Sequence, residues 1–359
     1  MKPKFYLVAI LFFTLNLFNF SVLADPAPSV PQFKHIVFFG DSLTDNGNLF
    51  KSVNDAIPKY PPYYNGRFTN GYNWSDLISY NLYSNYSIDA ANYAVGGATA
   101  AFENPSDGYL PLTLMMECRD YELRNLLNSK DDTLYAIWIG ANDYLSGRTD
   151  VDAATTNSVN AIVAVIKELA QNKNAQFLVV QLPDISLTPE ARELNFVDNY
   201  KQLITMHNQK LHAAVIALRA EYPNVKIIEF SFIDHPVLRN IVESPTYREA
   251  INQKYNLDIT DVTNSCWDGG YYANKPSMSA IQKTLNSAAT PAQNSQAIAQ
   301  QIASNPALME AYRVGQMSEN GAVVCSNPAQ HVFWDHVHPT VGMHKVLAGM
   351  FLDTVLSNQ

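Results

Sequence analysis

The sequence has few cysteines, a shortage of basic residues and few long apolar runs. Three cysteines in 359 residues are too few for a fold built on disulfides. The 24 lysines and arginines are outnumbered by 33 aspartates and glutamates, so the chain lacks the positive excess that nucleic-acid partners require. After the N-terminal region, no apolar run approaches the ~20 residues of a membrane-spanning helix. With 47% hydrophobic residues, however, the chain can form a sizeable core.

The N-terminal residues have the pattern of a secretory signal peptide. Lys2 and Lys4 precede an apolar run over residues 5–20, and small residues end at Ala24. We expect cleavage after Ala24, leaving a mature chain, 25–359, that is secreted into the periplasm or outside the cell. An uncleaved membrane anchor is the alternative, but the run is shorter than the ~20 residues that span a bilayer. Without its two lysines the mature chain has 22 basic residues against 33 acidic ones.

Short apolar runs alternate with helical segments, which is typical of parallel βαβ units. Because the runs are almost continuously apolar, we expect helices on both faces of the sheet. The sequence therefore predicts an α/β fold with three layers, α/β/α, and a central, mostly parallel sheet of flavodoxin-like type. The runs are HIVFFG (35–40), SIDAANYAV (87–95), TLYAIWIG (133–140), QFLVVQLP (176–183) and VKIIEF (225–230).

Two helices and one insertion complete the outline. Apolar residues at 3.6-residue spacing predict a helix over 159–170, between the third and fourth runs. A last helix follows Pro339, with the proline in its first turn and one apolar stripe. From about Leu257 to Gln330 the chain is rich in Ala, Ser, Gln and Asn, so we expect an insertion in a single domain. The stripe of the last helix is Met343, Val346, Leu347, Met350 and Phe351.

Polar residues follow the predicted strands. Ser42 comes after the first run, Gly97 after the second and Asn142 after the third, while Asp335 and His338 lie near the C-terminus. Ligands of an open α/β sheet gather at the carboxyl ends of its strands, so these residues are expected to meet. Taken alone, each stretch also fits an ordinary turn or helix cap.

Together the five residues meet the requirements of acyl transfer. Ser42 is the candidate nucleophile, His338 its base and Asp335 the acid that holds the base. The backbone N–H groups of Ser42 and Gly97 and the amide of Asn142 are candidate oxyanion donors. Since Asp335 lies three positions before His338, one tight turn can aim the carboxylate at the imidazole.

Four blocks of the sequence, GDSLTDNGN, NYAVGGA, GANDY and DHVHP, resemble those of the GDSL, or SGNH, hydrolase family of lipases and esterases. They have the same order and spacing and extend from Phe38 to His344. The resemblance implies a Ser-His-Asp triad, with no metal and no cofactor. It assigns Ser42, Asp335 and His338 to that triad, and Ser42, Gly97 and Asn142 to the oxyanion hole, and it makes Gly96 a turn residue.

The resemblance also narrows the substrate. Secreted bacterial GDSL phospholipases, lysophospholipases and acyltransferases are similar, so the predicted substrate is a lipid acyl ester, reached by transient contact with a membrane surface. The stretch YPPYYNGRF (60–68) fits either an acyl groove or a packed loop. A carbohydrate acetylesterase, an arylesterase and a non-catalytic binding module remain alternatives.

His336 raises a separate question, because it lies beside the candidate triad. With Asp335 and His338 it would make part of a metal site, but the other histidines show no matching ligand spacing. We therefore expect His336 to have a surface or supporting role.

The cysteines predict one disulfide. Cys266 and Cys325 bracket the insertion, whereas Cys118 lies in an expected amphipathic helix and fits a buried free thiol. A bridge would tether the insertion near His338. The tethered loop is then either a structural staple or a lid open to an activating protease.

Overall fold

The computed structural model describes most of the chain after residue 29. The described residues are 30–53, 55, 57–101, 112–145, 148–268, 277–287, 294–304, 309, 312 and 323–359. The expected signal peptide lies outside them. Within these ranges, no helix combines the length and the apolar character needed to cross a membrane.

Five parallel strands form the central sheet, in the order β2-β1-β3-β4-β5. Each predicted run contains one strand, and all residues of β3 and β4 are buried. β1 pairs with β3 from His35 opposite Thr133 to Gly40 opposite Trp138. The strand order is that of flavodoxin-like folds, with a switch point between β1 and β3. The strands are β1 (His35–Gly40), β2 (Asp89–Asn92), β3 (Thr133–Trp138), β4 (Gln176–Val180) and β5 (Lys226–Phe230).

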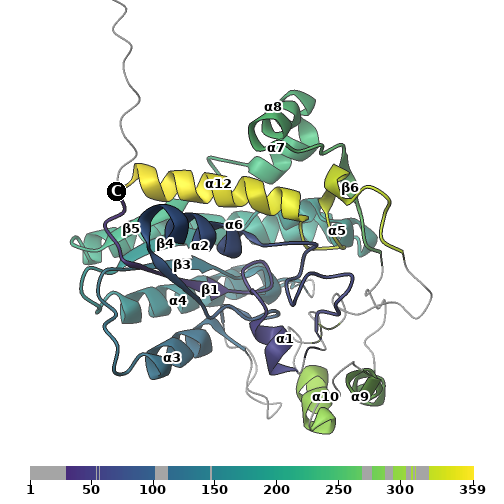
Figure 1. Cartoon of the computed structure of the whole chain (residues 1–359), viewed down its shortest axis with the longest axis horizontal. Helices are drawn as coiled ribbons and strands as arrows, with labels where there is room; N and C mark the ends of the chain where they lie inside the picture. Colours follow the sequence, from purple (N-terminus) through teal and green to yellow (C-terminus); the bar gives the residue numbers. More distant parts are fainter. Residues whose placement is uncertain are drawn as a thin grey trace, which may run out of the picture.

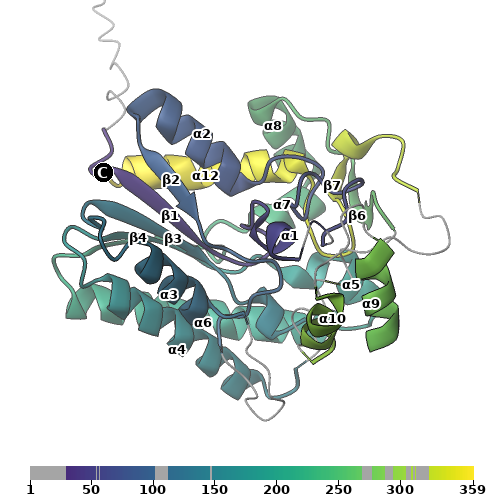
Figure 2. The same ribbon diagram turned by 60° about the horizontal axis from the view of Figure 1, so that its bottom comes forward.

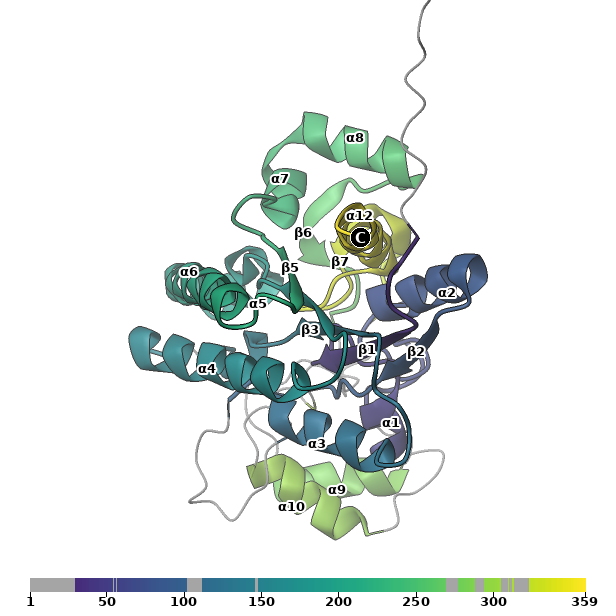
Figure 3. The ribbon, with the colours of Figure 1, turned by 90° about the vertical axis from the view of Figure 1, so that its left-hand side faces the viewer.

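Helices cover both faces of the sheet, which confirms the predicted three layers (Figure 3). α2 and α12 pack on one face, where Phe38 of β1 contacts Trp74 at a ring-centroid distance of 5.2 Å. α3 and α4 pack on the other face, against Val37 and Phe39 of the same strand. The helices of the α/β core are α1 (Asn48–Ser52), α2 (Trp74–Tyr86), α3 (Leu114–Arg124), α4 (Val151–Leu169), α5 (Pro189–Glu193), α6 (Val197–Glu221), α7 (Val237–Glu243), α8 (Pro245–Tyr255) and α12 (Val341–Ser357).

The last helix begins later than predicted. α12 starts at Val341 with Thr340 as its N-cap, so Pro339 precedes the helix instead of lying in its first turn. The reason is a second, two-stranded sheet of β6 (Asp261–Ser265) and β7 (His331–Phe333). Residues 339 and 340 are held in extended form beside β7, where Thr340 N–H donates to the Val332 carbonyl at 2.9 Å.

The segment expected to be an insertion packs against the N-terminal part of the chain. α9 (Met278–Ser287) and α10 (Ser295–Ser304) lie near α1, at the end of the sheet that also holds β6 (Figures 1 and 2). Ile281, Leu285 and Ile302 from this segment are buried in a cluster with Leu49 and Phe68. The segment is poor in large apolar residues, and its small core is completed by α1 and the residues after it.

The structure pairs Cys266 with Cys325 and leaves Cys118 as a buried free thiol in α3. The backbone N–H of Cys325 also donates to the Cys266 carbonyl at 2.7 Å. The disulfide therefore fixes the two ends of the segment that carries α9 and α10, close to β7.

Candidate active site

The predicted site residues lie at the carboxyl end of the sheet. Ser42 follows β1, Gly97 follows β2, and Asn142 lies in the short 3₁₀ helix η2 (Ala141–Asp143) after β3. Asp335 and His338 follow β7. Ser42 and Asn142 thus flank the switch point of the sheet, where α/β folds bind ligands.

Ser42, His338 and Asp335 form one hydrogen-bonded line. His338 Nε2 lies 2.7 Å from Ser42 Oγ, and His338 Nδ1 lies 2.8 Å from Asp335 Oδ2. Asp335 is fully buried, and His338 nearly so. This is the arrangement of a nucleophile, a base and an orienting acid.

The three-residue spacing from Asp335 to His338 allows one tight turn to join the two side chains. Asp335 Oδ1 accepts hydrogen bonds from the backbone N–H groups of Val337 at 2.8 Å and His338 at 2.7 Å. Burial alone would raise the pKa of the Asp335 carboxyl. The electrostatic interaction with His338 and the hydrogen bonds from His338 and Val337 outweigh burial and leave the pKa below its ordinary value. The carboxylate is therefore ionised and held in place.

Sequence reasoning did not identify Tyr63 as part of this site. Its hydroxyl donates to Asp335 Oδ2 at 2.7 Å, and the side chain is 1% exposed. Burial, followed by the charge of Asp335, raises the pKa of Tyr63 well above its ordinary value, so the hydroxyl stays a donor. No local signal separates Tyr63 from the neighbouring Tyr60 and Tyr64, because the contact joins residues 272 positions apart.

The stretch 60–68 packs against the candidate triad. The Phe68 ring lies 5.0 Å from the His338 ring, centroid to centroid, and 6.0 Å from the Tyr63 ring. Both aromatic side chains are buried. Of the two interpretations of this stretch, the structure favours the packed loop.

The candidate oxyanion donors come from three loops. Gly96 and Gly97 form a turn closed by Ala98 N–H donating to the Val95 carbonyl at 3.0 Å, and Gly97 has φ +80°, which favours glycine. Among the described residues, no acceptor contacts the N–H of Gly97 or of Ser42. One hydrogen of the Asn142 amide goes to the Ala98 carbonyl at 2.8 Å, which keeps the amide beside this turn.

Two buried carboxylates shape these loops, and neither was singled out from the sequence. Asp45 accepts the N–H of Gly96 at 2.7 Å and those of Gly47, Asn48 and Leu49 at the start of α1.

Glu117, on α3, accepts the N–H of Gly40 at 2.9 Å and that of Val95 at 3.2 Å, so it ties the ends of β1 and β2 together. Burial raises the pKa of Glu117 well above its ordinary value. The sequence did hold one indication of this role: Glu117 is an acid on the buried face of a helix, one residue before Cys118.

His336 hydrogen-bonds to a residue outside the candidate triad, and it is buried instead of lying on the surface. It is 8% exposed, and its Nδ1 lies 2.8 Å from Glu193 Oε2 on α5. Burial opposes the charged form, but the hydrogen bond and charge of Glu193 outweigh it and raise the pKa of His336. The two histidines thus have different partners, and the described residues contain no group of three or more metal-ligating side chains.

A narrow apolar cavity begins at Ser42. We call it the inner cavity; it has a volume of about 60 Å³ and extends between the sheet and α12. Asp41, Ser42 and Asn142 lie at its polar end, and burial raises the pKa of the Asp41 carboxyl to about 6. Its other walls are mainly apolar and include Trp138, Leu145, Ile185, Phe232, Leu238 and Leu347.

The chain resembles several characterised proteins over most of its length. The family model described as GDSL-like lipase/acylhydrolase matches residues 36–349. A phosphatidylcholine-sterol acyltransferase of Aeromonas hydrophila is 30% identical over 327 residues, which are 90% of each chain. The secreted effector protein SseJ of Salmonella typhimurium is also 30% identical, over 57% of this chain and 48% of that protein.

A solved structure, the carbohydrate acetylesterase Est24 of Sinorhizobium meliloti, is 16% identical over 55% of this chain and 83% of its own, with a TM-score of 0.37. Since the family model covers most of this chain, membership does not depend on that structure. The chain is a member of the GDSL-like lipase/acylhydrolase family, whose enzymes act on esters.

Proposed function

We propose that this ester hydrolase cleaves the acyl esters of membrane lipids through an acyl-enzyme on Ser42. The observation that carries the proposal is the hydrogen-bonded line from Ser42 through His338 to Asp335, placed at the mouth of the inner cavity. An activated serine beside an apolar cavity suits an ester with a hydrocarbon acyl group.

The chemistry follows from the positions of these groups. Ser42 Oγ attacks the ester carbonyl while His338 Nε2 takes the hydroxyl proton. The N–H groups of Ser42 and Gly97 and the Asn142 amide stabilise the negative oxygen of the tetrahedral intermediate. When the intermediate collapses, the C–O bond to the alcohol breaks and His338 gives its proton to the leaving oxygen.

The second half of the reaction repeats these steps with a new nucleophile. Water, or the hydroxyl of an acceptor alcohol, gives its proton to His338 and attacks the acyl-enzyme carbonyl. The product is then a free acid or a new ester, and Ser42 recovers its proton. Asp335 remains ionised and stabilises the imidazolium in both halves.

Three observations support the lipid substrate and the export of the enzyme. The relative from Aeromonas hydrophila is named for acyl transfer from phosphatidylcholine to sterol and matches 90% of this chain. The inner cavity is almost wholly apolar. The lysines and apolar run before Ala24 fit a signal peptide.

The substrate class is tested by comparing turnover of lysophosphatidylcholine, diacylphosphatidylcholine and acetylated xylan, with and without a sterol acceptor. We expect turnover of at least one phospholipid to exceed that of acetylated xylan by far. Sterol ester formation would add transferase activity to hydrolysis. Preferential release of acetate from xylan would contradict the lipid proposal and favour the carbohydrate acetylesterase.

We also propose that the disulfide-bound segment 267–324 acts either as a lid or as a staple. Phe68 belongs both to the cluster with α9 and α10 and to the surroundings of His338, so this segment contacts the support of the site. Proteolytic nicking within the segment, with the disulfide intact, separates the two roles. A change in lipid hydrolysis supports the lid and an activating protease, whereas unchanged activity leaves the staple.

A further inference from the structure

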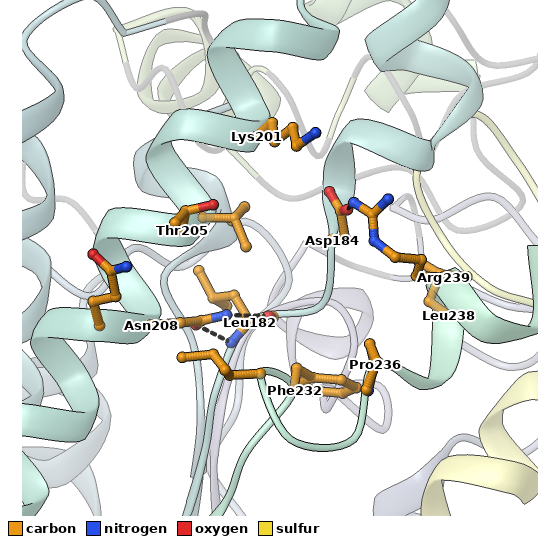
Figure 4. Close-up of a pocket in the computed structure, with 12 residues that line it drawn as sticks. Leu182, Asp184, Lys201, Thr205, Asn208, Phe232, Pro236, Leu238 and Arg239 are labelled. Carbon is orange, nitrogen blue, oxygen red and sulfur yellow. Dashed lines mark hydrogen bonds and ion pairs between the residues drawn. The ribbon is translucent and has the colours of Figure 1, made fainter. Parts of the chain in front are cut away.

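A second, larger cavity shares part of its wall with the inner cavity. This outer cavity has a volume of about 390 Å³ and lies between α6, α7 and the loops after β4 and β5 (Figure 4). The segment 182–185 separates the two spaces. Leu182 and Asp184 line the outer cavity, while Pro183 and Ile185 line the inner one.

Two side chains contribute to the walls of both cavities. Phe232, from the loop after β5, and Leu238, from α7, line the inner and the outer cavity alike. Phe232 is 7% exposed, and Leu238 is partly buried. The two spaces are therefore separated by apolar side chains, whose rotamers can change without breaking a hydrogen bond.

The inner cavity is too small for a long acyl chain. Its volume of about 60 Å³ is small beside the 390 Å³ of the outer cavity and leaves room for a few methylene groups only. An acyl chain that is bonded to Ser42 and enters this cavity fills it after a few carbons. The remainder of a lipid-length chain needs further space, and the outer cavity adjoins it.

Three polar side chains of the outer cavity, Asp184, Asn208 and Arg239, are paired with protein partners, and Lys201, Thr205 and Gln209 on α6 also line it. The side-chain amide of Asn208 is satisfied by the backbone of Leu182, with Nδ2 to the carbonyl at 2.8 Å and N–H to Oδ1 at 2.9 Å. Arg239 forms an ion pair with Asp184, which lies beside it in Figure 4. It forms a second ion pair, at 2.8 Å, with Glu243. The rest of the wall is apolar, formed by Leu182, Ile204, Phe232, Ile233, Pro236 and Leu238, which suits a hydrocarbon chain.

We propose that the outer cavity binds the distal part of a long acyl chain whose carbonyl carbon is bonded to Ser42. The chain enters the inner cavity, passes between Phe232 and Leu238 and extends along Ile204 of α6. The two shared side chains then set the acyl-chain preference of the enzyme. This inference rests on the proposed acyl-enzyme mechanism and adds the subsite that selects chain length.

The test is a chain-length profile of kcat/KM on p-nitrophenyl acetate, butyrate, octanoate, laurate and palmitate. Leu238→Trp narrows the passage. We expect its kcat/KM for laurate and palmitate to fall at least about ten-fold, because each buried methylene is worth about four-fold. Because Leu238 also lines the inner cavity, the effect is judged from the ratio of kcat/KM for palmitate to that for butyrate, which should fall at least about ten-fold.

Two further variants keep the test decisive. Thr205→Trp, at an exposed position of the outer cavity, should lower activity on palmitate more than on octanoate. Ile216→Trp, on an exposed part of the same helix outside both cavities, is the control and should leave the profile unchanged.

A profile that keeps its shape in both Leu238→Trp and Thr205→Trp overturns the subsite, even if Leu238→Trp lowers overall activity through misfolding. Failure of the underlying mechanism is distinguishable, because wild-type enzyme would then lack Ser42-dependent hydrolysis of p-nitrophenyl acetate as well.

Discussion

At the scale of single residues, the site depends on a buried carboxylate, that of Asp335, which accepts four hydrogen bonds. Asp335 has no exposed surface, yet its two oxygens accept hydrogen bonds from Val337 N–H, His338 N–H, His338 Nδ1 and the Tyr63 hydroxyl. A buried charge is costly unless it is paired and hydrogen-bonded, and each of these contacts lowers that cost. The same contacts fix the orientation of the His338 ring.

Tyr63→Phe tests this arrangement, because it removes one donor and keeps the ring. Hydrogen bonds to charged groups contribute about 1.5–3 kcal/mol, so we expect kcat to fall by roughly ten-fold or more, with a small change in KM. In an Asp335→Asn background the same substitution should have much less effect, since its charged acceptor is gone.

The matched control is Tyr135→Phe. Its hydroxyl is also buried, but it bonds to Asn172 at 2.8 Å, away from the site. Equal losses of kcat in Tyr63→Phe and Tyr135→Phe would mean that Tyr63 acts only through general stability.

At the scale of elements, the sequence was informative wherever burial leaves a local pattern. β1, β3 and β4 are almost wholly buried, so their apolar runs located them. The edge strand β2 has no fully buried residue, and it lies within a longer predicted run. The polar residues after β1, β2 and β3 located the edge where the site lies. Long-range contacts leave no such pattern. Neither the approach of Tyr63 to Asp335 nor the packing of α9 and α10 on α1 follows from local sequence, because each depends on where distant segments meet.

The loop that carries His338 contacts α5 through the ion pair between His336 and Glu193, and this contact gives a testable prediction. The ion pair with Glu193 raises the folded-state pKa of His336 above its ordinary value of 6.5. The stabilisation is therefore complete below about pH 6.5 and is lost as the pH rises through the folded-state pKa.

We predict that His336→Gln lowers the free energy of unfolding more at pH 5.5 than at pH 9, by roughly 1 kcal/mol or less, because Glu193 is partly exposed. The catalytic constant should remain within a few-fold of wild type, whereas His338→Ala should lose nearly all activity. Denaturant unfolding at the two pH values checks the first statement. A pH-independent difference between wild type and variant would contradict the ion-pair account.

At the scale of the whole molecule, two buried histidines make the free energy of unfolding depend on pH. His207 on α6 and His344 on α12 have their pKa values lowered to about 3, in both cases mainly by burial. Both are neutral in the folded chain, with His207 Nδ1 bonded to the Tyr144 hydroxyl at 2.7 Å and His344 Nδ1 accepting from Trp74 N–H at 3.3 Å. Unfolding in acid lets them take up protons.

The folded-state pKa of His207 lies below its unfolded value of 6.5, so its contribution to stability falls as the pH drops from about 6.5 towards 3. Each such group contributes about 1.4 kcal/mol per pH unit in that window. We predict that His207→Gln makes the free energy of unfolding less dependent on pH between 6 and 4.

Asp41 acts in the opposite sense, because its pKa of about 6 makes stability rise as the pH falls towards 3.8. Asp41 has the same effect in wild type and in His207→Gln, so the difference between their free energies of unfolding reports on His207 alone. Parallel curves for the two proteins would show that His207 takes up its proton without unfolding.

The central claim is that Ser42, activated by His338, is the nucleophile of an ester hydrolase. The most direct test of this claim is mass mapping of the protein after reaction with a serine-directed fluorophosphonate. We predict one adduct per chain on the peptide that contains Ser42, complete loss of ester hydrolysis, and little labelling of His338→Ala. Ser42→Ala should fold, escape labelling and lose activity by a factor on the order of 10⁵. An adduct on another residue, or more than a few per cent of wild-type activity in Ser42→Ala, would contradict the claim.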